Sequence, residues 1–208
     1  MTDKTDKEIR ELAEKFRAVR PSEWKDIPDI HLYKDQVIEI MEDQHIGFSI
    51  DEDESLTPAM INNYTKSGLL PRAEGKRYDR NHIAFLTVIC MLKQILPVKT
   101  AGQLLREFAG DSSDTEIFYE KYRKLLDEKC AETGKLIDDC GDEEEIINLA
   151  VQLAVSSYVE RLACKRLTEL LSEDREKARA NKEKPAREDK TRKNQKETEN
   201  RAHRKGKE

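Results

Sequence analysis

The chain has 208 residues, of which 39% are charged and 6% aromatic, and its net charge is −5. A chain of this length can form one or two small domains and bury a core. Such abundant charge favours helices with charged outer faces and narrow apolar stripes over a strand-rich sandwich. No apolar run approaches the roughly 18 residues that a membrane span requires. The N-terminal segment lacks the apolar stretch of a secretory signal, so we expect a cytoplasmic protein without a membrane partner.

Neither the cysteines nor the histidines are spaced for a metal site or for catalysis. No cysteine pair forms a CxxC motif, and no histidine stands at a zinc-finger spacing from Cys90, Cys130, Cys140 or Cys164. We therefore expect reduced thiols packed on helices. The sequence also lacks a nucleophile elbow and a phosphate-binding loop. It predicts no catalytic residues, no metal and no cofactor, and hence a protein that is not an enzyme.

Positive charge is concentrated in the middle of the chain. Residues 55–110 contain eight Lys and Arg against three Asp and Glu. Residues 1–54 contain eight against sixteen, and residues 111–172 contain eight against fifteen. A basic segment inside an acidic chain indicates a preference for a type of partner rather than a type of fold.

The N-terminal part predicts two helices with a connector between them. Apolar residues at helical spacing favour a first helix from Lys4 to Val19, which ends before Pro21. A second helix is expected from Asp35 to Gln44. Trp24 lies in the connector; we interpret it as a packing residue, with a ligand or partner contact as the alternative.

The basic segment predicts three helices. Thr57 and Pro58 are typical of a helix start and Gly68 of a helix end, which gives a short helix over 58–66. A basic turn over 72–78 follows. A long helix is capped by Asp79 and stopped by Pro97, and His82 in its first turn is expected to be exposed, with a phosphate contact as the alternative. Thr100 and Gln103 form a capping-box pattern for one more helix.

The C-terminal part predicts a helical hairpin followed by a disordered tail. A capping-box pattern at Ser113 and Glu116 opens a helix to about Lys129. Gly134 and Gly141 bracket a short link, and the next helix, 143–171, has an apolar surface wider than one stripe. From Glu173 the sequence holds fourteen Lys and Arg, nine Asp and Glu and few apolar residues, so we expect disorder beyond a helical extension.

We therefore expect a mainly all-α protein in four segments. These are an N-terminal helix and connector (1–34), a winged helix-turn-helix domain (35–110), a helical region for dimerisation or sensing (111–172) and the charged tail (173–208).

Two family resemblances support the winged helix-turn-helix. MINNYTKSGLLPRAEGKRYDRNHIAFLTVICMLKQI resembles the DNA-binding head of the mercury-resistance-regulator (MerR-like) family, in which Gly-Leu-Leu-Pro precedes a wing that ends in tyrosine. Asn62 and Lys76 stand where that family has arginines. A closer resemblance, carried by DIHLYKDQV, LTPAMINNY and KRYDRNHI over about Ile27 to Phe108, is to a bacterial family catalogued as domain of unknown function 1836. It implies a fold without an established activity.

The sequence predicts a sequence-specific DNA-binding protein that regulates transcription. The helix 58–66 would enter the major groove, where asparagine suits the edge of adenine, and the wing 72–78 would contact phosphates. The DNA-binding residues expected from this arrangement are Asn62, Asn63, Lys66, Arg72, Lys76, Arg77 and Tyr78.

Two alternatives remain open at the level of the sequence. The asparagines can be merely exposed helix residues and Lys76-Arg77 a solvated turn. The whole module can also serve protein–protein interaction without binding DNA. With double-stranded DNA as the partner, a homodimer is expected, because two copies double the site that is read and the helix 143–171 needs a cover for its apolar surface.

Overall fold

The structure is a computed structural model that describes residues 2–18, 20–44, 55–110 and 114–205, with side chains as far as Arg175. The chain divides into two compact units, Met1–Ala163 and Cys164–Glu208. The two units are fewer than the four segments predicted from the sequence, and the boundaries of those four segments stay a prediction.

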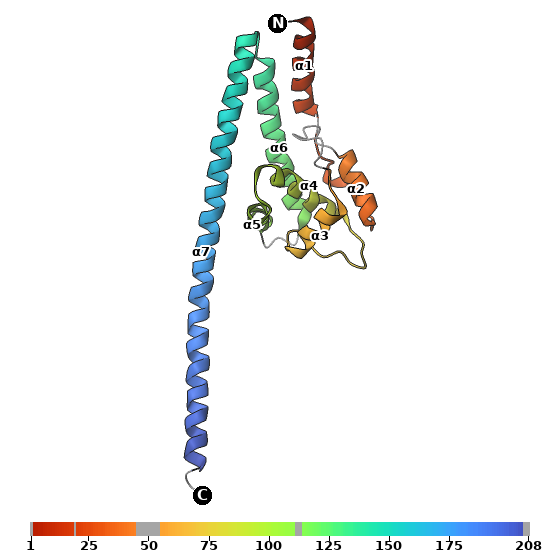
Figure 1. The fold of residues 1–208 in the computed structure, drawn as a ribbon. Coiled ribbons are helices and arrows are strands. Elements are labelled where there is room, and N and C mark those ends of the chain that lie inside the picture. Colours follow the sequence, from red (N-terminus) through yellow and green to blue (C-terminus); the bar gives the residue numbers. More distant parts are fainter. Residues whose placement is uncertain (1, 19, 45–54, 111–113, 206–208) are drawn as a thin grey trace. The chain divides into compact units, whose positions relative to one another are not determined.

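The described residues are mainly helical, as the sequence predicts. Seven α-helices are joined by turns and by one short 3-10 helix, and these residues contain isolated β-bridges but no β-strand. The helices are α1 (Asp3–Ala18), α2 (Lys34–Asp43), α3 (Pro58–Lys66), α4 (Arg80–Ile95), α5 (Val98–Ala109), α6 (Thr115–Asp138) and α7 (Glu143–Lys205), and the 3-10 helix is Trp24–Asp26 (Figure 1).

Helix α4 forms the centre of the first unit. Its sequence is apolar around most of its circumference, as expected of a helix that is covered on several sides, and Ile83, Leu86 and Ile89 are almost completely buried. Helices α2, α5 and α6 all pack against it. The basic segment is thus anchored to the core by its longest helix.

Helices α1 and α6 lie side by side (Figure 1). A Cβ atom at Gly134 of α6 would stand 3.2 Å from the carbonyl oxygen of Ala13 and 3.1 Å from Cγ of Arg17. The prediction that Gly134 belongs to a link between helices is therefore wrong. Gly134 lies inside α6, where its missing side chain lets α1 approach closely.

The connector before α2 packs against α6, as we interpreted Trp24. The Tyr119 hydroxyl donates a hydrogen bond to the carbonyl oxygen of Ser22 (2.8 Å), and the Tyr119 and Trp24 rings are 6.1 Å apart. Burial of Tyr119 raises its pKa to about 12. These contacts fix the chain where it enters the candidate site.

Two helix starts differ from the predicted ones. Helix α5 begins at Val98, directly after Pro97, so the Thr100–Gln103 pattern lies inside the helix and caps nothing. Proline before the first turn is compatible with this start because it needs no N–H partner there. Helix α6 is capped by Asp114, whose carboxylate accepts hydrogen bonds from the backbone N–H groups of Glu116 and Ile117. Ser113 lies outside the described residues.

Helix α7 begins where the sequence predicts and extends further than expected. Its start is fixed by Asp142, which accepts the backbone N–H of Glu145 (2.9 Å), while the Glu145 carboxylate accepts the N–H of Gly141 (2.6 Å). The helix runs to Lys205, through most of the segment predicted to be disordered. Glu, Lys, Arg, Gln and Ala dominate this segment and are strong helix formers, a tendency that an argument from missing apolar residues overlooks.

Candidate functional site

The short helix α3 begins and ends as its sequence predicts. The Thr57 hydroxyl accepts a hydrogen bond from the N–H of Met60 (3.2 Å), and Pro58 occupies the first helical position. Gly68 has φ of +71°, the left-handed conformation typical of the residue beyond a helix end. Ile61 and Tyr64 are buried beneath the helix. The packing of these two residues leaves the opposite face of α3, with Asn62 and Lys66, exposed.

The basic turn is a tight hairpin with a left-handed residue at each central position. Glu74 and Arg77 form an antiparallel bridge, in which the N–H of Arg77 donates to the carbonyl oxygen of Glu74 (2.9 Å). Gly75 has φ of +54° and Lys76 has φ of +63°. Two positive φ values define the type I′ turn, which favours Asn or Gly at these positions. Lys76 therefore holds a conformation that a side chain disfavours.

The backbone of Tyr78 ties the turn to the segment that precedes α2. Leu32 and Tyr78 form an antiparallel bridge with N–H···O distances of 2.8 and 2.9 Å. The Tyr78 ring is 6% exposed and meets the ring of His82 edge-on at 5.3 Å. Burial raises the pKa of Tyr78. This predicted DNA-binding residue thus positions the turn and is not part of the exposed surface.

His82 and Asp79 close the start of α4. The Asp79 carboxylate accepts the backbone N–H of His82 (3.1 Å), and His82 Nδ1 lies 2.6 Å from Asp79 Oδ1. Burial alone would raise the pKa of Asp79, but the hydrogen bonds from the side chain and backbone of His82 outweigh it and lower that pKa. His82 is 6% exposed, so the expectation of an exposed histidine is wrong: its ring is held beneath the turn by Tyr78 and Asp79.

Two side-chain contacts join α3 and the turn through the start of α2. Lys34 Nζ donates to Oδ1 of Asn62 (2.7 Å). Arg77 donates to the Tyr33 hydroxyl (2.8 Å), and its guanidinium lies 4.6 Å from the centre of the Tyr33 ring. Because Tyr33 and Lys34 are adjacent, Asn62 and Arg77 are brought to one surface. We call this surface the α3–turn surface and define it by Tyr33, Lys34, the exposed face of α3 and residues 72–77.

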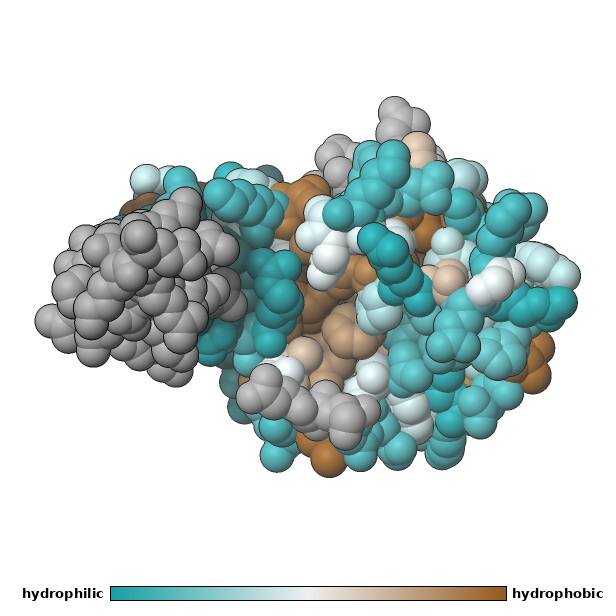
Figure 2. All heavy atoms as spheres, turned by 90° about the horizontal axis from the view of Figure 1, so that it is seen from below, coloured by the Kyte–Doolittle hydropathy of each residue, from teal (hydrophilic) through white to brown (hydrophobic). Residues whose placement is uncertain are grey.

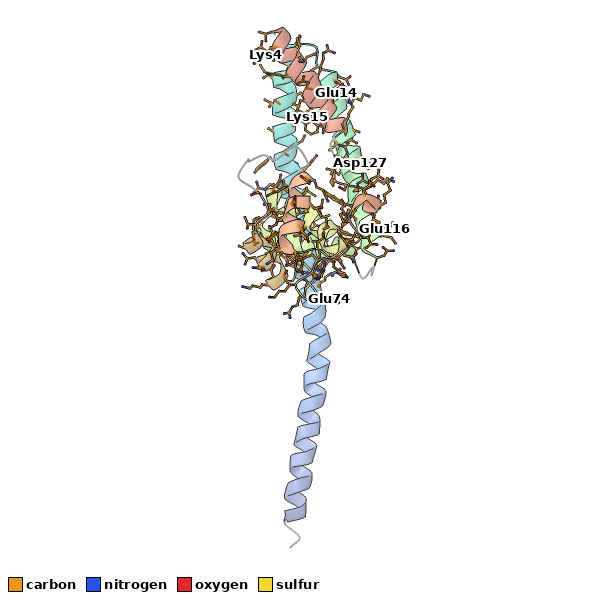
Figure 3. The ribbon with its side chains drawn as sticks, turned by 90° about the vertical axis from the view of Figure 1, so that its right-hand side faces the viewer. Lys4, Glu14, Lys15, Glu74, Glu116 and Asp127 are labelled. Atoms are coloured by element: carbon orange, nitrogen blue, oxygen red, sulfur yellow. The ribbon has the colours of Figure 1, made fainter. Side chains whose placement is uncertain are left out.

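The remaining predicted residues are exposed on the same elements. Asn63, Lys66, Arg72 and Lys76 are all accessible to solvent on α3 and the turn. No hydrogen bond or ion pair described for these four joins one of them to another. Glu74 is the acidic member of the turn, and it lies at the opposite end of the first unit from Lys4 in α1 (Figure 3). The side of the unit where α3 lies is largely hydrophilic, with apolar surface in a hollow beside it (Figure 2).

Sequence reasoning missed Tyr33 and Lys34. Both belong to DIHLYKDQV, which carries the resemblance to a family but stands apart from the basic segment in the sequence. Leu32 is buried and anchors this stretch against the turn. A buried leucine followed directly by an aromatic and a basic residue is too common a pattern to indicate a site by itself.

The first unit also contains an apolar cavity of about 300 Å³ between α4, α5 and α6. Its walls are formed by Val88, Met91, Leu92, Leu104, Leu105, Phe108, Tyr122, Leu125, Leu126 and Lys129. Ligand sites usually add a few polar groups that orient the ligand. The polar groups of this wall are the Lys129 ammonium, which is paired with Glu132 (2.8 Å), and the buried Tyr122 hydroxyl, for which no hydrogen-bond partner is described. These two groups do not define a ligand.

The described residues define a mainly helical protein with an exposed, predominantly basic surface beside a buried core. Among them, no group of three or more His, Cys, Asp or Glu side chains is placed to hold a metal ion. None of the described helices combines the length and the hydropathy needed to cross a membrane.

Comparison with known proteins places the chain in a family. Residues 22–125 match the family described as Domain of unknown function (DUF1836), and the chain belongs to this family. The match includes α2 to α5 and the first part of α6, and thus the whole α3–turn surface. No curated protein and no solved structure matches the chain.

Proposed function

We propose that the chain is a sequence-specific DNA-binding protein, in which α2 and α3 act as the helix-turn-helix and residues 72–78 as the wing. The observation that carries this proposal is the pair of contacts that joins Asn62 to Lys34 and Arg77 to Tyr33. These contacts gather an amide side chain of a short exposed helix and the basic turn on one surface. Regulation of transcription is the role that we propose for this activity.

Charge on the α3–turn surface suits the DNA backbone. Lys34, Lys66, Arg72, Lys76 and Arg77 supply five positive side chains. Lysines and arginines on a turn and at a helix contact phosphates, which orient a protein on the duplex without reading its sequence. Glu74 opposes this effect at the tip of the turn. Tyr33 restrains Arg77 by a hydrogen bond and by its ring, so this guanidinium loses less conformational freedom on binding a phosphate.

The asparagines of α3 would recognise the DNA bases. A bidentate pairing of asparagine with adenine uses both the amide oxygen and the amide nitrogen, and contributes about 1–3 kcal/mol of discrimination. The oxygen of Asn62 already accepts Lys34 Nζ, so Lys34 must move away before Asn62 can make this pairing. Asn63, which is exposed without this contact, is the stronger candidate for base recognition.

A homodimer is part of the proposal, because two copies double the length of DNA that is read. The alternative is an interaction module for other proteins that uses the same surface. The DNA-binding function and the protein-interaction function differ in how affinity for DNA depends on salt. A DNA-binding protein binds a duplex and loses affinity as salt cations compete for the phosphates, whereas the interaction module does not bind the duplex.

The test uses the full chain, a random-sequence duplex and a double variant of the turn. We expect Lys76→Ala/Arg77→Ala to weaken binding roughly tenfold or more at 100 mM salt, because two phosphate contacts are lost. Lys121→Ala/Lys124→Ala is the matched control, because it removes two exposed charges from α6, outside the surface. The proposal is wrong if the turn variant binds the duplex as tightly as the wild type and the control.

A further inference from the structure

Helix α7 carries two apolar faces within the first unit. One face holds Ile146, Leu149 and Leu153, which are partly covered. Glu160 lies on the same face and faces α6, because the pKa of Lys129 in α6 is raised first by Glu132 and further by Glu160. The other face is not covered. Its members are between 54% and 69% exposed and are Ile147, Val151, Val155, Tyr158, Val159 and Leu162. We call these six residues the outward stripe.

The outward stripe is a continuous surface. With about 100° of rotation per residue, Ile147, Val151, Val155, Tyr158 and Leu162 fall within an arc of about 80°, and Val159 borders it. The stripe extends for roughly 22 Å at the helical rise of about 1.5 Å per residue. Its steps of four, four, three and four residues keep to one side of a nearly straight helix, as an eleven-residue repeat does. A partner helix can therefore follow its whole length.

The size of the stripe matches one half of a protein–protein interface. If each side chain exposes roughly 100 Å², scaled from the 150–250 Å² that an aromatic residue can bury, the six expose about 600 Å². Two such surfaces together reach about 1,200 Å², the lower limit of stable interfaces. The largest apolar patch of a typical monomer is about 300–600 Å² and is often functional. The stripe is therefore at the upper end of the apolar patches that monomers expose, and a second copy of it is large enough to cover it.

Charges at the two ends of the stripe fix the direction of the second copy. Three glutamates, Glu143 to Glu145, precede the stripe, and Lys165 and Arg166 follow it in the sequence. In the antiparallel register that sets Ile147 opposite Leu162, Val151 stands opposite Tyr158 and Glu144 opposite Lys165. A parallel pair would instead bring the glutamates of both copies together, and like charges in contact are unfavourable.

We propose that a second copy of this chain docks on the outward stripe, with the two α7 helices antiparallel and Glu144 of each copy facing Lys165 of the other. The homodimer itself is part of the proposed function, but this interface does not need DNA or the α3–turn surface. The arrangement is isologous, so that each contact occurs twice about one axis near Val155.

The first experiment measures the mass of the full chain without DNA by sedimentation and light scattering from 1 to 100 µM. We expect a dimer for the wild type and a monomer for Val151→Glu/Tyr158→Glu, because both charges would be buried in the interface. Gln152→Glu/Ser156→Glu is the matched control on exposed positions of α7 outside the stripe, and it should remain dimeric. A monomeric wild type at 100 µM, or a dimeric stripe variant, would overturn the proposal.

The second experiment exchanges the charges at the two ends of the stripe. It leaves the six apolar residues of the stripe unchanged, so its result does not depend on whether the stripe accepts a substitution. Glu144→Lys and Lys165→Glu should each weaken the dimer roughly tenfold, because each sets like charges opposite each other at two symmetric places. The double variant should return to within about threefold of the wild type. In a parallel pair each of these two positions would face the same position of the other copy, so like charges stay in contact in every variant and the double variant would not recover affinity relative to the single ones. Failure of the double variant to recover affinity contradicts the antiparallel register, whatever the outcome of the DNA-binding tests.

Discussion

At Lys76, local stability and the proposed function oppose each other. A side chain in the left-handed region costs about 1–2 kcal/mol relative to glycine, and the turn would be better formed with glycine at this position. A strained residue in an exposed turn is a reason to look for a function. The proposed contact with a phosphate gives Lys76 one.

Replacement of Lys76 therefore separates stability from binding. We expect Lys76→Gly to raise the free energy of unfolding by about 0.5–1 kcal/mol, since relief of strain exceeds the added entropy of the unfolded chain. Lys76→Ala keeps the strained φ of +63° and should not stabilise. Both variants lose the charge and should bind DNA equally weakly. Urea denaturation measures the difference, and equal stability of the two variants would show that the turn is not strained.

Tyr119 makes the first unit sensitive to alkaline pH. Its pKa in the folded chain is raised to about 12 by burial, whereas an unfolded tyrosine titrates near 10. A raised folded pKa contributes stability that is complete below pH 10 and is lost as the pH rises through about 12.

The corresponding variant is Tyr119→Phe. Its free energy of unfolding at neutral pH should be lower by about 1–2 kcal/mol than that of the wild type, because the Ser22 carbonyl oxygen loses its hydrogen-bond donor. Between pH 10 and 12, its stability should fall less steeply than that of the wild type, since one of the titrating groups is gone. Denaturation midpoints across this range give both quantities. Parallel pH profiles for the two proteins would mean that Tyr119 does not titrate in the folded chain.

At the scale of the elements, helix starts and ends are predicted better than helix contacts. Thr57, Gly68 and Asp79 act within a few residues of themselves, so their roles are visible in the sequence. Gly134 acts on α1, more than a hundred residues away in the chain, and only the packing distinguishes it from a glycine that ends a helix. The links through Tyr33 and Lys34 are hidden for the same reason, because they join residues that are distant in the sequence.

The close contact between α1 and α6 can be tested at this glycine. Gly134→Leu should destabilise the chain by about 1–3 kcal/mol through overpacking, although leucine favours a helix more than glycine does. Ala131→Leu places the same side chain on an exposed position of α6 and should leave stability nearly unchanged. Thermal unfolding followed by circular dichroism compares them. Equal melting temperatures for the two variants would rule out a close approach at Gly134.

At the scale of the whole molecule, the fold class follows from composition but the partner does not. High charge and few aromatic residues predict a helical protein, and the described residues are mainly helical. The continuation of α7 to Lys205 is longer than the helical extension expected after Glu173, because low apolar content limits burial and does not prevent a helix. A net charge of −5 gives no hint of a basic surface; the local excess of Lys and Arg over residues 55–110 does, but the contribution of Lys34 becomes visible only when it is placed beside α3.

The salt dependence of DNA binding tests the proposed function most directly. Lys34, Lys66, Arg72, Lys76 and Arg77 would neutralise up to five phosphates per copy, which predicts a slope of log K against log salt of about −4 to −5 for each bound copy. Titration of a fluorescent random duplex with the full chain at 50, 100 and 200 mM salt gives this slope. For Lys76→Ala/Arg77→Ala we expect it to be shallower by about 2. Binding that does not change with salt, or no binding at 50 mM salt, would contradict a DNA-binding function.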